Sequence, residues 1–143
     1  MTIFKKILDD KGVLVYSNKG KSMLPLIKEG RDILVIKKET ENIRKWDIVL
    51  VQRPSGRYLL HRIVKIHSDG TYTLCGDNNI IYDLGIKKSD IRGKLVSIIT
   101  DGKENNLTSF SYRLYVLFWC KPIYIRKICL KIWNTLNTKI YHL

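Results

Sequence analysis

The stretch of sequence that decides the fold, residues 46–66, reads WDIVLVQRPSGRYLLHRIVKI. It contains two runs of aliphatic, β-branched and aromatic residues, Ile48–Val51 and Tyr58–Ile66, on either side of Pro54-Ser55-Gly56. Runs of this kind, bounded by proline and glycine, are typical of strands joined by a turn. The stretch therefore predicts two strands of a β domain.

Further runs of the same kind lie on both sides of this stretch. They are Val13–Tyr16, Ile33–Ile36, Tyr72–Leu74 and Leu95–Ile99, with turn residues at Ser68-Asp69-Gly70 and Gly76-Asp77-Asn78-Asn79. Short strands at this spacing predict a mainly β domain, antiparallel and coiled or barrel-like. Residues 2–9 have the apolar spacing of a short helix that ends at Asp10-Lys11-Gly12.

The 143 residues, 45% of them apolar, are enough for one domain with its own core. A polar break at Asp101–Asn106 separates this domain from a glycine-free region, Ser111–Ile140, that is predicted to be helical. Pro122 is expected to divide the helical region in two. We therefore predict a β domain over residues 1–105 and a basic, aromatic-rich helical tail over 106–143.

The tail carries much of the positive charge. The formal net charge is +13, and residues 110–143 contain six basic residues and no acidic one. Apolar residues recur there at three- and four-residue steps: Ile125, Ile128, Cys129, Ile132, Leu136 and Ile140. Two interpretations follow: this stripe packs on the β domain, or the tail lies on an anionic membrane surface. The longest uncharged run, Leu114–Cys120, is far below the roughly 20 residues that cross a bilayer, so no spanning helix is predicted.

The cysteines and the N-terminus bear on the compartment. Cys75, Cys120 and Cys129 form neither a CxxC pair nor a zinc-ligand pattern, so no disulfide framework or structural metal is expected. The first ten residues lack the apolar core of a signal peptide or membrane anchor. The expected location is cytoplasmic, including a peripheral position on the inner face of the membrane.

Ser22, His61, Asp77 and Asp83 are the candidate catalytic residues. A serine hydroxyl becomes a nucleophile when a base takes its proton, and a histidine titrates near neutrality and suits that role. Either aspartate could hold the histidine in one tautomer. Taken singly, each residue is more typical of a turn or of a strand interior.

Four motifs in order carry a more specific signal. They are Ser22-Met23-Leu24-Pro25, Gly30–Val35, His61-Arg62-Ile63-Val64 preceded by Trp46–Val51, and Gly76-Asp77-Asn78-Asn79 followed by Asp83. Their order and content resemble the signal peptidases, the S26 group within the S24/S26 serine peptidases. Most bacterial members have a lysine base where this chain has His61, and the histidine is similar to the endoplasmic-reticulum type. Trp46 stands where a glycine is usual.

This resemblance implies a cofactor-free serine endopeptidase that cleaves peptides or proteins at leader or signal-type sites. Ser22 would be the nucleophile, His61 the general base, and Asp83 or Asp77 the orienting acid, with Asp83 favoured. The main-chain N–H of Ser22 would contribute to the oxyanion hole. Lys65, four residues beyond His61, is a less favoured base.

Two alternatives remain. The first is a self-cleaving regulator of the LexA-like S24 type, which shares the β fold but uses a lysine base. The second is a non-catalytic basic module that binds a membrane or nucleic acid through its net charge. If the chain is a peptidase, nucleic acid is not an expected partner.

Overall fold

The computed structural model describes residues 3–38 and 41–140, and for residues 137–140 it describes the backbone alone. The chain forms two compact units, Met1–Ser109 and Phe110–Leu143. Each unit is described by itself below.

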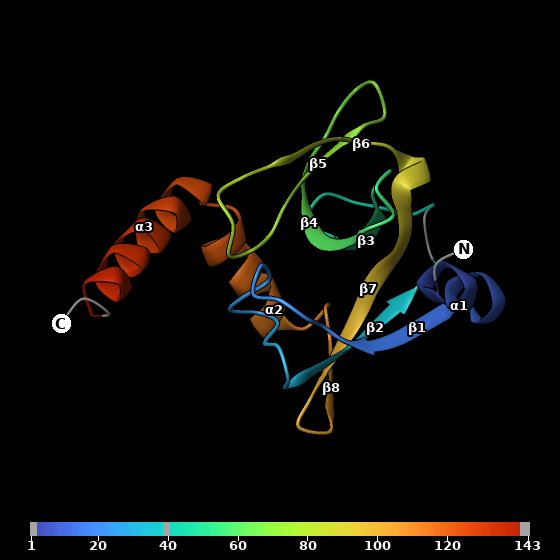
Figure 1. Ribbon diagram of the computed structural model, residues 1–143, viewed down its shortest axis with the longest axis horizontal. Coiled ribbons are helices and arrows are strands. Elements are labelled where there is room, and N and C mark those ends of the chain that lie inside the picture. Colours follow the sequence, from blue (N-terminus) through green and yellow to red (C-terminus); the bar gives the residue numbers. More distant parts are fainter. Residues whose placement is uncertain (1–2, 39–40, 141–143) are drawn as a thin grey trace. The chain divides into compact units, whose positions relative to one another are not determined.

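The first unit is built on one antiparallel sheet of eight strands (Figure 1). The strands are β1 Val13–Ser17, β2 Asp32–Lys37, β3 Ile48–Gln52, β4 Tyr58–Ile66, β5 Tyr72–Cys75, β6 Asp83–Ile86, β7 Ile91–Thr100 and β8 Lys103–Asn106. Their order in the sheet is β1-β2-β7-β3-β4-β5-β6, and β8 pairs with β7. The predicted mainly β, antiparallel fold with a C-terminal helical extension is confirmed, and the sheet is open.

The β3–β4 hairpin lies between two hydrophobic clusters. Its register places Leu50 opposite Leu60 and Val49 opposite His61. Successive strand residues point to opposite faces, so Leu50 joins one cluster while Val49 joins the other. Residues 48–51 do not alternate between apolar and polar side chains, because both faces of strand β3 are buried here.

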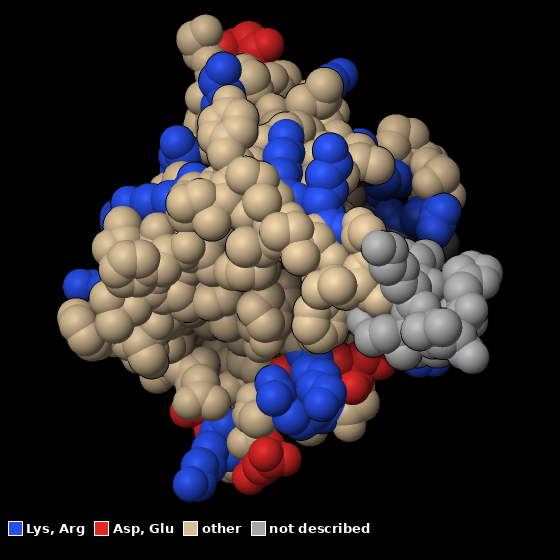
Figure 2. Space-filling view, turned by 90° about the vertical axis from the view of Figure 1, so that its left-hand side faces the viewer, with Lys and Arg blue, Asp and Glu red and all other residues tan. Residues whose placement is uncertain are grey.

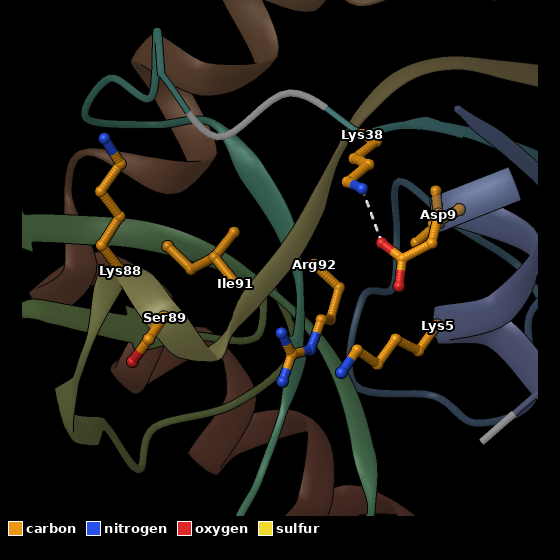
Figure 3. A pocket seen from close by; sticks show the side chains of 8 residues that line it. Lys5, Asp9, Lys38, Lys88, Ser89, Ile91 and Arg92 are labelled. Carbon is orange, nitrogen blue, oxygen red and sulfur yellow. Dashed lines mark hydrogen bonds and ion pairs between the residues drawn. The ribbon is translucent and has the colours of Figure 1, made fainter. Parts of the chain in front are cut away.

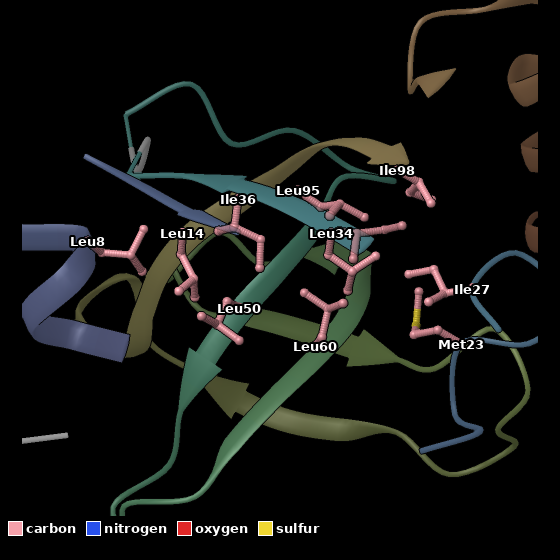
Figure 4. Packing of buried hydrophobic residues seen from close by; sticks show 11 residues of the cluster. Leu8, Leu14, Met23, Ile27, Leu34, Ile36, Leu50, Leu60, Leu95 and Ile98 are labelled. Carbon is pink, nitrogen blue, oxygen red and sulfur yellow. The ribbon is translucent and has the colours of Figure 1, made fainter. Parts of the chain in front are cut away.

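The larger cluster also fixes the elements around Ser22. Helix α1, Ile3–Lys11, contributes Leu8, and the segment after β1 contributes Met23 and Ile27, all three almost fully buried (Figure 4). Burying side chains of this size contributes about 1.5–3 kcal/mol each. The residue that follows Ser22 is thus anchored in the core.

Two strands were not predicted, β6 and β8. The Asp101–Asn106 segment, expected to be a polar break, turns at Asp101 and Gly102, which both have positive φ, and returns as β8 along β7. Every residue of β8 is exposed, so backbone pairing forms this strand without an apolar pattern. The predicted helix at residues 2–9 appears as α1, beginning at Ile3, and Thr2 lies outside the described residues.

The second unit is helical. It consists of α2 Phe110–Tyr115, a π-helical turn Val116–Cys120 and α3 Ile123–Ile140. Pro122 directly precedes α3, where its missing N–H costs no helical hydrogen bond. Within the described part of the chain, no helix is long and apolar enough to cross a membrane.

The apolar stripe predicted in the tail lies along α3. Ile125, Ile128, Ile132 and Leu136 are each more than half exposed. The side chain of Ile140, the last member of the predicted stripe, lies outside the described residues.

Candidate active site

Ser22 lies in the turn segment between β1 and β2, which is tied to the loop after β5. The main-chain N–H of Asn78 donates to the Ser22 carbonyl oxygen at 2.8 Å, and the Asn78 side-chain amide donates to the Lys21 carbonyl oxygen at 3.1 Å. With Met23 buried in the core, the backbone on both sides of Ser22 is held. A fixed backbone is what positions a nucleophilic hydroxyl.

His61 points its Nδ1 atom toward Asp83. The residue lies in β4, 6% exposed, and Nδ1 is 2.6 Å from Asp83 Oδ2. The other carboxylate oxygen, Oδ1, accepts a hydrogen bond from Arg53 Nη2 at 2.5 Å. Because an ionised carboxylate only accepts, Nδ1 carries the hydrogen and Nε2 keeps a free lone pair.

The environment of His61 favours its neutral form. Burial lowers the pKa of His61 below its ordinary value of 6.5, against the opposing hydrogen bond and charge of Asp83. The imidazole is therefore neutral at neutral pH, the protonation state that a general base requires.

Gly76 brings the Nε2 side of His61 next to Ser22. A Cβ atom added to Gly76 would lie 2.6 Å from the Ser22 carbonyl oxygen and 3.0 Å from His61 Nε2. Both atoms therefore face the same point, and a side chain at residue 76 would enter the space between them. The structure thus brings together Ser22, His61 and Asp83, three of the four candidate residues.

Asp77, the fourth candidate, has a different partner. Its carboxylate accepts two hydrogen bonds from Arg62, from Nε at 2.8 Å and from Nη2 at 2.6 Å. Both side chains are fully buried. Arg62 Nη1 also donates to the Trp46 carbonyl oxygen at 2.8 Å. Asp77 thus neutralises a buried arginine beside the candidate base, while Asp83 contacts the base itself.

Trp46 has a left-handed backbone. Its φ is 80°, in the region that favours glycine. This backbone conformation explains why a glycine is usual at this position in the signal peptidases, which the chain resembles. Its N–H donates to the Ile63 carbonyl oxygen at 2.8 Å, so the turn into β3 is held against β4.

A pocket of about 450 Å³ opens beside Ser22. Phe4, Tyr16 and Tyr58 form an aromatic wall, with ring centroids 5.1 and 5.2 Å from Phe4. Burial raises the pKa of Tyr16 to about 12, so its hydroxyl stays neutral. The Tyr58 hydroxyl is buried and has no hydrogen-bond partner among the described residues. Asn18 and the cation Lys19 also line the pocket, and aromatic and aliphatic side chains make up most of the rest of its lining.

The main-chain N–H of Ser22 has no hydrogen-bond acceptor within residues 3–38 and 41–140. An N–H on the nucleophile's own backbone is the donor that an oxyanion hole needs.

Lys65, the less favoured base, is exposed on β4. His67, another histidine of the chain, has its Nε2 atom 2.8 Å from Thr73 Oγ1. No cluster of three or more His, Cys, Asp or Glu side chains suited to a metal occurs among the described residues.

Three residues of the site were not assigned a role from the sequence: Arg53, Gly76 and Asn78. Gly76 and Asn78 lie in a motif that was quoted for its aspartate, so a signal was present. Arg53 had none, because only the fold brings the β3–β4 turn to Asp83.

The comparisons with known proteins bear on the family of the chain. No curated protein matches the chain. The family model described as Peptidase S24-like matches residues 2–96, which include Ser22, His61, Asp77 and Asp83. The chain therefore belongs to the Peptidase S24-like family, within the S24/S26 serine peptidases.

Proposed function

We propose that the chain is a serine endopeptidase of the signal-peptidase type, with Ser22 as nucleophile, His61 as general base and Asp83 as orienting acid. One observation carries the proposal: His61 binds Asp83 through Nδ1 at 2.6 Å while its Nε2 faces the same point as the Ser22 backbone. The buried Asp77–Arg62 pair supports the assignment of Asp83, because Asp77 is occupied elsewhere.

The reaction follows from these positions. His61 Nε2 takes the proton of the Ser22 hydroxyl as its oxygen attacks the scissile carbonyl carbon. The Ser22 N–H stabilises the negative oxygen of the tetrahedral intermediate, and Asp83 stabilises the imidazolium. His61 then protonates the leaving amine, which gives an acyl-enzyme. Water, deprotonated by His61, releases the acid product and restores the hydroxyl.

The proposed substrate is a peptide or protein with a leader or signal-type cleavage site. The aromatic and aliphatic side chains that line most of the pocket beside Ser22 support an uncharged residue near the scissile bond. The resemblance to signal peptidases supports small residues just before the cut.

Cleavage of a leader-type peptide by the full chain tests the mechanism. Ser22→Ala and His61→Ala should each abolish turnover and labelling by a fluorophosphonate probe, with circular dichroism unchanged. His67→Ala and Ser55→Ala are matched controls outside the site and should retain both. Full activity in either site variant would overturn the mechanism, and binding without any cleavage would favour a non-catalytic basic module.

Self-cleavage of the LexA-like kind is the second candidate, favoured by the S24-like family match. The histidine at position 61 argues against it, because those regulators use lysine. Incubation of the full chain alone distinguishes the two functions. A first-order cut in its own chain, with a rate independent of protein concentration, would support self-cleavage. Turnover of added peptide by an intact chain would support the endopeptidase.

We further propose that α3 holds the enzyme on an anionic membrane surface, at the inner face of the membrane. Exposed Ile128 and Ile132 share a stripe, and basic residues such as Lys127 and Lys131 lie on the same helix. Figure 2 shows more Lys and Arg than Asp and Glu side chains on this face, in line with the formal net charge of +13. An apolar face together with basic residues is the composition of an interfacial helix.

Sedimentation with phosphatidylserine-containing vesicles tests this. Ile128→Glu with Ile132→Glu should abolish co-sedimentation and leave peptide cleavage intact. Thr135→Glu with Asn134→Glu is a control with the same change in charge. Equal binding to neutral vesicles, or equal loss in the control, would contradict an amphipathic surface helix.

A further inference from the structure

A second pocket, of about 440 Å³, lies away from Ser22 and is dominated by basic side chains (Figure 3). Its four cations come from four different segments: Lys5 from α1, Lys38 from the position after β2, Lys88 from the 3₁₀ turn Lys88–Asp90, and Arg92 from β7. The residues that line it include one carboxylate, that of Asp9. The lining thus has a formal charge of +3.

The pairings within the pocket leave much of this charge uncompensated. Lys38 Nζ binds Asp9 Oδ1 at 2.6 Å. Arg92 Nε donates to the neutral amide oxygen of Gln52 at 3.1 Å and keeps its full charge. In the part of the chain that the structure describes, Lys5 has no acidic partner.

The positive field reaches the one carboxylate. The hydrogen bond from Lys38 lowers the pKa of Asp9, and the charges of Lys5 and Arg92 lower it further. Lys5 and Arg92 therefore act on the same small region, and Figure 3 shows their side chains extending toward each other.

The fourth cation, Lys88, lies apart from the other three. It pairs with Glu41 at 3.0 Å, but both side chains are largely exposed, at 50% and 80%. An exposed pair of this kind contributes little to stability, so an incoming carboxylate can replace Glu41. In Figure 3, Lys88 lies on the far side of Ile91 from Lys5 and Arg92.

The floor between these charges is apolar. Leu8 is 1% and Ile91 3% exposed, so both are packed in place. Cations spread around an apolar floor fit an extended ligand with several carboxylates better than one compact phosphate, which would need donors that converge on one point. An acidic peptide segment with an apolar side chain between its carboxylates has this form.

Helix α1 connects this pocket with the candidate active site. Phe4 lines the pocket beside Ser22, whereas its neighbour Lys5, with Leu8 and Asp9, lines the basic pocket. We propose, resting on the proposed peptidase function, that the basic pocket is an exosite for an acidic segment of the polypeptide substrate. The scissile bond would then lie on one side of α1 and the acidic segment on the other.

Direct binding tests the pocket without catalysis. A fluorescent peptide of alternating Asp, Glu and Leu is titrated into the full chain carrying Ser22→Ala, and anisotropy is measured. Adding Lys5→Glu with Arg92→Glu should weaken binding at least about tenfold. The matched control, Arg57→Glu with Lys103→Glu, makes the same change in net charge on exposed residues elsewhere and should weaken it less than about threefold.

Three results would overturn the exosite. The peptide could fail to bind, or both double variants could lose the same affinity, which would mean attraction by net charge alone. Inorganic phosphate could displace the peptide better than chloride at equal ionic strength, which would indicate a site for a compact anion.

Cleavage kinetics test the link to the substrate. With Ser22 intact, Lys5→Glu with Arg92→Glu should raise KM for a leader-type peptide extended by the acidic segment, at unchanged kcat. It should not alter cleavage of the same peptide without the segment. Equal loss for both peptides would refute the exosite. Absence of cleavage in every variant would count against the proposed function alone, because the anisotropy assay decides the ligand of the pocket independently.

Discussion

Asp83 and Asp77 lie near the same histidine motif, and replacing each by asparagine separates their roles. Asp83→Asn removes the carboxylate 2.6 Å from His61 Nδ1. The new amide can donate to Nδ1, which places the imidazole hydrogen on Nε2, where it cannot take a proton from Ser22. We expect turnover to fall by roughly three to four orders of magnitude.

The stability effects should have the opposite order. Asp83 is 21% exposed and its partner Arg53 33%, so losing that pair should cost about 1 kcal/mol or less. Asp77→Asn leaves the fully buried Arg62 without its counter-charge. Removing one partner of a buried pair costs about 3–5 kcal/mol, a large part of the roughly 5–15 kcal/mol that stabilises a domain.

Urea unfolding followed by circular dichroism, together with peptide turnover, measures both effects. Asp69→Asn, in an exposed turn, is the control and should change neither by much. The reasoning is refuted if Asp83→Asn keeps near-normal turnover, or if Asp77→Asn is no less stable than Asp83→Asn. Exchanged results would assign the orienting role to Asp77.

Three further predictions test the site and its support. Burial lowers the pKa of His61, so kcat/KM should be constant near neutral pH. It should fall at lower pH with an apparent pKa below 6.5. A fall in kcat/KM with an apparent pKa above 6.5 would contradict this. Gly76→Ala should abolish turnover, because the added Cβ atom would lie 2.6 Å from the Ser22 carbonyl oxygen. Gly70→Ala is the control: the added Cβ atom would have no other atom within 4 Å, but φ at this residue is 80°. It should therefore lose about 1 kcal/mol of stability and keep its activity. Leu34→Ala, at a fully buried position, should lower the unfolding free energy by about 2–5 kcal/mol in the same urea assay. A smaller loss would mean that the larger hydrophobic cluster closes the cavity left by the leucine side chain.

Each strand that the sequence predicted contributes at least one buried apolar side chain. Ile48–Val51 and Tyr58–Ile66 are apolar because they lie between or beside the two clusters, so composition alone reveals them. Strand β8 has no buried residue and forms through backbone pairing with β7, and no side-chain pattern marks such a strand.

The site divides in the same way. The chain order of Ser22, His61, Asp77 and Asp83 is a property of the sequence, and it was enough to predict a serine peptidase of the S24/S26 group. The pairing of the two aspartates with His61 and Arg62 depends on the β4–β5–β6 register, which only the folded sheet provides. The same holds for Arg53, whose contact with Asp83 joins residues 30 positions apart.

The sequence by itself thus determined a β peptidase domain, a basic helical tail and a set of candidate catalytic residues. Buried strands are visible in the sequence as apolar runs, and the order of the motifs can be read directly along the chain. The tertiary structure decided which acid contacts the histidine, why residue 76 has no side chain, and that four scattered cations line one pocket. Those properties depend on distances between segments far apart in the chain, and such distances are set by strand pairing and core packing rather than by any single stretch of residues.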